Sequence, residues 1–310
     1  MISIREAVQA YVKLRRALGF KMNDTERALG SFASFMEENH ASVVTSTLAL
    51  QWATQNTTSK PARWAARLAC VRGFARHWSA IDPRTEVPAQ HLLPFKPKRI
   101  QPRLYSDEEI DQLLKAALRL LPQSGLRPWT YHAIFGLLAV TGLRIGEAVA
   151  LEKSDVDLQT GLLLVREAKL RKSRLVPLHE STVCVLKQYA ERRDRLYPDV
   201  ATQRFFRTDR GRQIGCAGVR STFDLLRREL GFDRCGDARR PRIHDLRHTF
   251  AVSSLIRWYR NGDDIDRKMP VLSAYLGHGD VNNTYWYLTG CPELMGMAVG
   301  RLEERWRNPR

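Results

Sequence analysis

A basic, proline-rich segment at residues 94–104 constrains the fold more than any other feature of the sequence. It reads Pro-Phe-Lys-Pro-Lys-Arg-Ile-Gln-Pro-Arg-Leu, and its three prolines exclude a continuous helix and a central strand, because proline lacks the backbone N–H and fixes φ. We therefore expect a linker here, between a domain at residues 1–93 and a larger domain at residues 105–310. The basic residues of the linker are candidates for contacts with a nucleic-acid backbone: Lys96, Lys98 and Arg99.

The N-terminal part of the chain has apolar residues at helical spacing. We expect helices over residues 3–20, from residue 24 onward, over residues 47–55, and after Ser59, which would cap the fourth helix with Pro61 in its first turn. Arginines border the apolar stripe of that fourth helix. They either lie in solvent with their stems on the core edge or bind phosphates, and the basic composition favours phosphates. These arginines are Arg63, Arg67, Arg72 and Arg76.

The C-terminal part combines helices with one short hairpin. The sequence Ser-Asp-Glu-Glu at residues 106–109 is a capping box that begins a helix through residue 120. A turn signal at residues 159–161 precedes two short runs of strand-forming residues, 162–165 and 174–177. Further helices are expected at residues 129–140, 144–151, 181–195, 218–230, 244–260, 281–288 and 292–306. The predicted fold class is mainly α with a small antiparallel β-sheet, in two domains.

The chain carries an excess of positive charge. Lys and Arg number 50 against 33 Asp and Glu, which gives a formal net charge of +17 and indicates a nucleic-acid partner. No apolar run approaches the roughly 20 residues of a membrane span, so no membrane partner is expected. The five cysteines include no C-x-x-C pair, and we expect buried, reduced thiols in a cytoplasmic protein rather than disulfides or a zinc ribbon.

Three short frames, far apart in the sequence, contain residues suited to binding and attacking a phosphate. Thr-Gly-Leu-Arg-Ile-Gly-Glu places Arg144 after a helix break, and His-Asp-Leu-Arg-His places His244 and Arg247 on one helix face. Leu-Gly-His ends at His278, and Tyr287 follows nine residues later. An arginine fork matches two phosphate oxygens, and histidine donates or accepts a proton. A tyrosine hydroxyl becomes nucleophilic where cations stabilise its phenolate.

Two choices among the candidates stay open in the sequence. Lys169 and Lys172 both belong to the tip of the predicted hairpin, together with Arg171, and either lysine could reach a scissile phosphate. An ammonium among other cations has a lowered pKa, so it can protonate a departing alkoxide. A charged hairpin tip with no such role is the alternative, and Arg171 and Lys172 are also candidate DNA contacts. Tyr285 and Tyr287 are two residues apart, so only one of them can face a site from a helix.

A zinc site is the competing interpretation of the histidine frame. His244 and His248 stand at i and i+4, the spacing found on the helix of zinc proteases. However, an aspartate occupies the position of the expected glutamate, and Arg247 between the histidines would repel a dication. We therefore expect no metal and no other cofactor.

Together these frames resemble the tyrosine recombinase (phage integrase) family over roughly residues 105–290. The arginine box, the hairpin lysine, the His-x-x-Arg helix and the Leu-Gly-His frame with its tyrosine all occur in the family's order. The resemblance implies a helical core-binding domain that contacts DNA, followed by a catalytic domain. The catalytic residues it implies are Arg144, Lys169, His244, Arg247, His278 and Tyr287. The stretch Gly-His-Gly-Asp-Val-Asn-Asn-Thr-Tyr-Trp-Tyr-Leu is similar to recombinases of transposon-like mobile elements.

The resemblance also implies a reaction and a set of partners. The protein would be a site-specific recombinase that cuts and rejoins DNA through a 3′-phosphotyrosine, for integration, excision or transposition of a mobile element. Its partners would be double-stranded DNA with a recombination site, and either further copies in a tetramer or related recombinases, in a bacterial cytoplasm at the nucleoid. Two alternatives stay open: DNA relaxation of the type IB topoisomerase kind, and a non-catalytic DNA-binding regulator.

Overall fold

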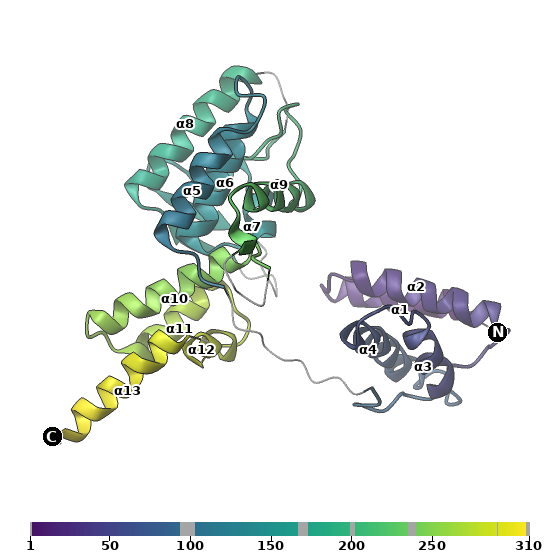
Figure 1. Ribbon diagram of the computed structural model, residues 1–310. Coiled ribbons are helices and arrows are strands. Elements are labelled where there is room, and N and C mark those ends of the chain that lie inside the picture. Colours follow the sequence, from purple (N-terminus) through teal and green to yellow (C-terminus); the bar gives the residue numbers. More distant parts are fainter. Residues whose placement is uncertain are drawn as a thin grey trace. The chain divides into compact units, whose positions relative to one another are not determined.

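The chain divides into two compact units, Met1–Ile100 and Gln101–Arg310, in the computed structural model (Figure 1). The structure describes residues 2–93, 103–166, 173–198, 202–234, 240–289 and 291–307. The division falls within the expected linker at residues 94–104, whose candidates Lys96, Lys98 and Arg99 lie outside the described residues. Each unit has its own buried core.

The described part of the N-terminal unit is helical. Its helices are α1 (Ile4–Ala17), α2 (Asn23–Glu38), α3 (Ser46–Thr54) and α4 (Pro61–Trp78). The largest side chains of its core are fully buried: Leu29, Phe32, Met36, Trp52 and Phe74. The expectation that Ser59 caps α4 is wrong, because Lys60 occupies the cap position and Pro61 begins the helix. Proline alone can begin a helix, because its φ is already helical. Its missing N–H loses no hydrogen bond at the first helical position, where that group has no partner within the helix.

The described part of the larger unit combines helices with a small sheet. The helices of its first part are α5 (Asp107–Leu118), α6 (Arg127–Thr141), α7 (Ile145–Ala150), α8 (Glu180–Leu196) and α9 (Cys216–Glu229). The capping box predicted at residues 106–109 is present at the start of α5, where Ser106 and Glu109 exchange bonds with each other's backbone N–H. Helix α6 is buried along most of its length, as with Ile134 and Phe135, and provides the centre of this core.

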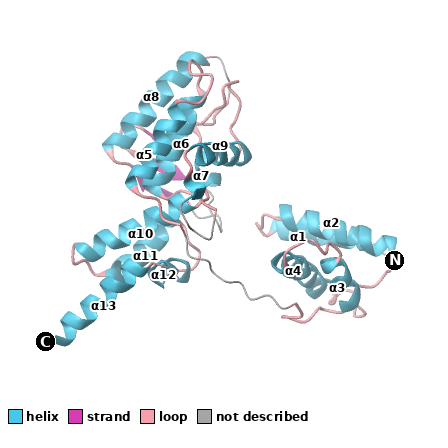
Figure 2. Ribbon diagram, in the orientation of Figure 1, coloured by secondary structure: helices cyan, strands magenta, loops and turns pink. Residues whose placement is uncertain are grey.

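The sheet is antiparallel, with strand order β1-β2-β3. Its strands are β1 (Val156–Asp157), β2 (Leu162–Val165) and β3 (Arg174–Pro177) (Figure 2). Val165 pairs with Arg174, so the hairpin puts Arg174 at the first position of β3. The predicted fold class, mainly α with a small antiparallel sheet, is confirmed.

The last part of the chain forms a second core in the same unit. It consists of α10 (Asp245–Arg260), α11 (Ile265–Leu276), α12 (Asn282–Thr289) and α13 (Pro292–Arg307). Helix α11 is not among the helices expected from the sequence. Pro270 lies inside it, and proline normally interrupts a helix. Asp264 caps its start, and the burial of Met269 and Leu272 against α10 and α12 holds it in place despite the proline.

Two of these helices end at a glycine in the left-handed conformation. Gly142 follows α6 with a φ of 61°, and Gly277 follows α11 with a φ of 67°. Such a residue stops the helix and turns the chain, and glycine adopts it without a steric penalty. The break predicted at Thr141 and Gly142 is therefore confirmed.

The structure also bears on the expectations of buried thiols and of no membrane-spanning segment. Cys291 is buried, Cys70 and Cys216 are half-buried, and Cys184 is exposed; all four are free thiols. The expectation of a buried thiol is therefore wrong for Cys184, which points outward from α8, and Cys235 lies outside the described residues. Among the described helices, none combines the length and hydropathy needed to cross a membrane.

Candidate active site

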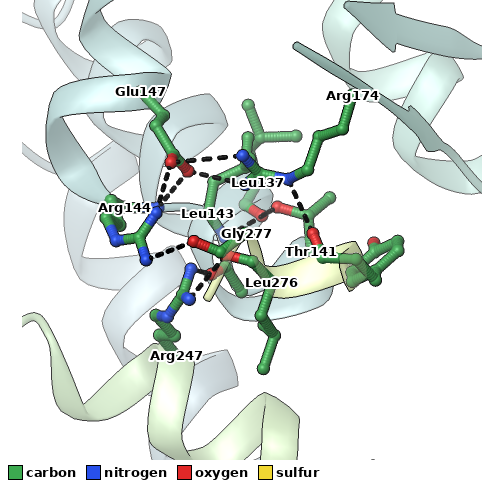
Figure 3. A network of polar contacts seen from close by, with 11 residues as sticks. Leu137, Thr141, Leu143, Arg144, Glu147, Arg174, Arg247, Leu276 and Gly277 are labelled. Atoms are coloured by element: carbon green, nitrogen blue, oxygen red, sulfur yellow. Dashed lines mark hydrogen bonds and ion pairs between the residues drawn. The ribbon is translucent and has the colours of Figure 1, made fainter. Parts of the chain in front are cut away.

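Three arginines converge on the last backbone carbonyls of α11 (Figure 3). Their bonds run from Arg174 Nε to Tyr275 O (2.6 Å), from Arg247 Nη2 to Leu276 O (2.7 Å), and from Arg144 Nη2 to Gly277 O (2.8 Å). The last carbonyls of a helix lack partners within the helix and carry its negative partial charge. Three consecutive carbonyls therefore each bind one guanidinium group. These groups come from β3, α10 and the N-cap of α7.

A carboxylate from α7 lies between two of these arginines. Glu147 Oε1 accepts from Arg144 Nη1 at 2.7 Å, and Oε2 accepts from Arg174 Nη2 at 2.7 Å. Burial alone would raise the pKa of Glu147, but hydrogen bonds from Arg174 and the Arg144 backbone outweigh it, and the net pKa is lowered. Glu147 is therefore ionised at neutral pH and fixes the orientation of both guanidinium groups.

Arg247 is the most buried of the three arginines. Its side chain donates to Gly142 O at 2.8 Å as well as to Leu276 O, so the glycine-capped ends of α6 and α11 hold it from two sides. Burial, followed by the charge of Arg144, lowers its pKa to about 10. The guanidinium therefore stays charged at neutral pH, which suits a group that binds an anion.

Tyr287 on α12 is buried beside this arginine cluster, with 2% of its surface exposed. Its hydroxyl lies 3.1 Å from His248 Nδ1. Burial raises the pKa of Tyr287, and the charges of Arg247 and Arg144 oppose that rise. Tyr285, the other tyrosine considered, is 38% exposed, so the two tyrosines point to different sides of α12.

The two other candidate histidines occupy different environments. His278 is half-buried, and its Nδ1 lies 2.7 Å from the hydroxyl of Thr284. Burial lowers the pKa of His278 to about 4, and the charges of Arg247 and Arg144 add to the effect, so it is neutral at pH 7. His244 is the exposed N-cap residue of α10, and its ring centroid lies 4.8 Å from that of His248.

The candidate residues of the separate frames thus meet in one place. Arg144 and Arg247 donate to adjacent carbonyls, and both act electrostatically on His278 and Tyr287. The hairpin candidates Lys169, Arg171 and Lys172 lie outside the described residues.

The four arginines of α4 do not form one equivalent surface. Arg63 and Arg76 are exposed, whereas Arg67 stacks over the ring of Trp52 with its Cζ 4.0 Å from the centroid. Arg72 donates from Nε to Pro88 O and from Nη2 to Ala89 O, both at 2.8 Å. Arg72 therefore braces the segment after α4. These bonds occupy two of its five donors, which makes Arg72 a weaker candidate for a phosphate contact than the exposed Arg63 and Arg76.

Several residues of the site were not singled out in the sequence. Arg174 and Glu147 belong to the arginine cluster, His248 contacts Tyr287, and Thr284 contacts His278. Glu147 and His248 stand inside the frames already identified, but His248 was considered only as a zinc ligand. No group of three or more His, Cys, Asp or Glu side chains suited to a metal ion occurs among the residues that the structure describes.

Comparisons with known proteins define the class. The family model described as the phage integrase family matches residues 103–291. The chain is 47% identical to the putative integrase/recombinase y4rB of Sinorhizobium fredii, over 99% of each chain. It is 30% identical to the tyrosine recombinase XerC of Chlorobaculum parvum, covering 74% of this chain and 69% of that one. The chain therefore belongs to the phage integrase family.

Solved structures agree on the architecture. The XerA recombinase is 25% identical, with a TM-score of 0.51 over 98% of this chain and 99% of the other. The Tn1549 transposon integrase in complex with transposon right end DNA gives a TM-score of 0.66 at 16% identity, over 96% and 98% of the two chains, and this shows the shared fold. The protein is a tyrosine-type site-specific recombinase that acts on DNA, and neither topoisomerase-like relaxation nor a purely regulatory role is favoured.

Proposed function

We propose that Tyr287 is the nucleophile that attacks a DNA phosphodiester, forms a 3′-phosphotyrosine and releases a 5′-hydroxyl. The observation that carries this proposal is the position of its hydroxyl beside Arg247 and Arg144, whose charges favour the phenolate. The bond energy is retained in the phosphotyrosine, so a 5′-hydroxyl from a partner strand can reverse the step without an external energy source.

The other candidate residues bind the phosphate, stabilise its charge and transfer protons. Arg144, Arg247 and His278 bind the non-bridging oxygens and stabilise the charge of the transition state. The backbone and Glu147 contacts described above use two of the five donors of each guanidinium, and Arg247 also hydrogen-bonds Tyr287, so further N–H groups remain for the substrate. Lys169 protonates the departing 5′ oxygen, and His244 manages the tyrosine proton or braces the phosphate.

The proposed substrate is a duplex that both units contact. Arg63 and Arg76 are exposed on α4, and Lys96, Lys98 and Arg99 belong to the basic linker; all of these suit phosphate contacts. Recombination joins two duplexes, so the acting form is a tetramer of this chain or an assembly with related recombinases. We place its work at the ends of a mobile element, by integration, excision or transposition, in the bacterial cytoplasm at the nucleoid.

The test is covalent capture on nicked duplexes that tile the ends of the genetic element carrying the gene. A nick next to the cleaved phosphate lets the released fragment diffuse away, so the protein–DNA adduct accumulates. Wild type and Tyr285→Phe are expected to give the adduct, and Tyr287→Phe is not. An adduct with Tyr287→Phe would remove this tyrosine from the role. Two further assays separate recombinase from topoisomerase activity. A recombinase should recombine a substrate with two sites and should not relax a supercoiled plasmid that lacks the sites.

A further inference from the structure

The hydroxyl of Tyr287 has a histidine partner that neither the family motif nor the sequence frames had assigned to it. His248 Nδ1 lies 3.1 Å from the phenol oxygen, and the two rings meet edge to face at a centroid distance of 5.5 Å. His248 directly follows Arg247 on α10, so the same helix turn supplies an anion-binding guanidinium and an imidazole to the nucleophile. His248 is half-buried, and its ring also packs against that of Trp286 at a centroid distance of 5.6 Å.

We propose that His248 accepts the proton of the Tyr287 hydroxyl during attack on phosphorus and returns it during resealing. This inference rests on the proposed function. In the cleavage step the phenol O–H bond breaks as a bond forms between the proton and His248 Nδ1. The phenol oxygen forms its bond to phosphorus, the bond from phosphorus to the 5′ oxygen breaks, and Lys169 protonates that oxygen. His244, at the exposed start of α10, is then the histidine that braces the phosphate.

The surroundings of the pair explain why a base is needed. Free tyrosine has a pKa of about 10, and burial raises it further here, so the phenol is protonated at neutral pH. Arg247 from α10 and Arg144 from the N-cap of α7 face Tyr287 and favour its anion, while His278 stacks at a ring distance of 6.3 Å. His248 itself faces His244 on α10 and Trp286 on α12. The entering phosphate supplies the negative charge that stabilises an imidazolium at this point.

The role requires one tautomer of His248. Its proton must be on Nε2, so that Nδ1 has a free lone pair and accepts the hydrogen bond from the phenol. Asparagine is the matched replacement, because its side-chain oxygen can accept the same hydrogen bond but cannot take the proton. His248→Asn therefore separates proton transfer from the positioning of Tyr287.

The experiment measures the rate of adduct formation on a nicked duplex from about pH 5.5 to pH 9.5. His248→Asn is expected to be about 100-fold slower than wild type near pH 7, within the usual range for losing a general base. The deficit is expected to shrink as the pH rises, because the phenolate then forms without a base. His244→Asn is the matched control and is expected to lose a similar factor at every pH. A wild-type rate for His248→Asn, or a deficit independent of pH, would overturn the inference.

A second substrate tests where along the reaction His248 acts. Sulfur in place of the 5′ bridging oxygen gives a leaving thiolate that needs no proton. We expect it to restore cleavage by Lys169→Ala but not by His248→Asn, and equal rescue of both would assign His248 to the leaving group instead. His248→Gln is a second variant should the asparagine protein fold poorly. No adduct from wild type would contradict the proposed function, whereas adduct from wild type and His248→Asn at equal rates contradicts only this inference.

Discussion

Gly277 is the position where a single added methyl group should damage the arginine cluster most. Its φ of 67° is left-handed, and an added Cβ would lie 2.8 Å from Arg174 Nη1 and 3.1 Å from its Cζ. The end of an arginine side chain normally moves aside at little cost. Here it is only 12% exposed and is held by Glu147 and Tyr275 O, so moving it breaks hydrogen bonds. Gly277→Ala should therefore destabilise the larger unit and lower the rate of adduct formation.

The expected loss of stability has two parts. A non-glycine residue in the left-handed region costs about 1–2 kcal/mol. Losing one charge-assisted hydrogen bond of Arg174 adds about 1.5–3 kcal/mol. Gly277→Ala is therefore expected to lower the free energy of unfolding by about 2.5–5 kcal/mol.

Gly262 provides the matched control for the first part. Its φ is 75°, and no atom lies within 4 Å of the Cβ that an alanine would add. Gly262→Ala should lose only about 1–2 kcal/mol. Thermal unfolding should then place the Gly277→Ala transition about 3–12 °C below that of Gly262→Ala, because a domain of this size loses about 2–4 °C per kcal/mol. Equal stability of the two variants would refute the claim that Arg174 is fixed where the methyl group must go.

Three further predictions concern other contacts. Glu147→Gln should lower the free energy of unfolding by about 3–5 kcal/mol at pH 7. Because the folded-state pKa of Glu147 is lowered, this loss should shrink in urea unfolding as the pH falls below about 4. Thr284→Val should slow adduct formation about tenfold by releasing His278, and Thr284→Ser should not. Arg72→Ala should destabilise the N-terminal unit and leave the salt dependence of DNA binding unchanged, whereas Arg76→Ala should reduce its log–log slope by about 0.9.

Some helix boundaries that the sequence predicts correctly depend only on neighbouring residues. The capping box at Ser106 and the glycine at residue 142 act over a few residues, so they can be identified without knowledge of the fold. Helix α11 is different. Pro270 argues against a helix locally, and the compensation comes from burial of Met269 and Leu272 against distant helices. That tertiary contribution cannot be derived from the local pattern.

The same distinction applies to the candidate site. The order and spacing of the three frames predict which arginines, histidines and tyrosine to consider, and their convergence is a matter of tertiary structure. Arg144 and Arg247 donate to backbone carbonyls, and such contacts cannot be predicted from a pattern of side chains. Arg72 and Arg76 show the converse. Their charges are equal, but the fold gives Arg72 two backbone acceptors and leaves Arg76 exposed.

The charges of the cluster suggest what it is built to stabilise. Arg144, Arg174 and Arg247 with Glu147 have a net charge of three minus one, or +2, since Arg247 stays protonated and Glu147 ionised. A phosphodiester carries one negative charge, and attack by a phenolate brings a second one to the phosphorus centre. The cluster therefore matches the transition state better than the bound substrate, which is the condition for lowering a barrier. Because Glu147 and the carbonyls of α11 fix the guanidinium groups in advance, little reorganisation is needed when that charge develops.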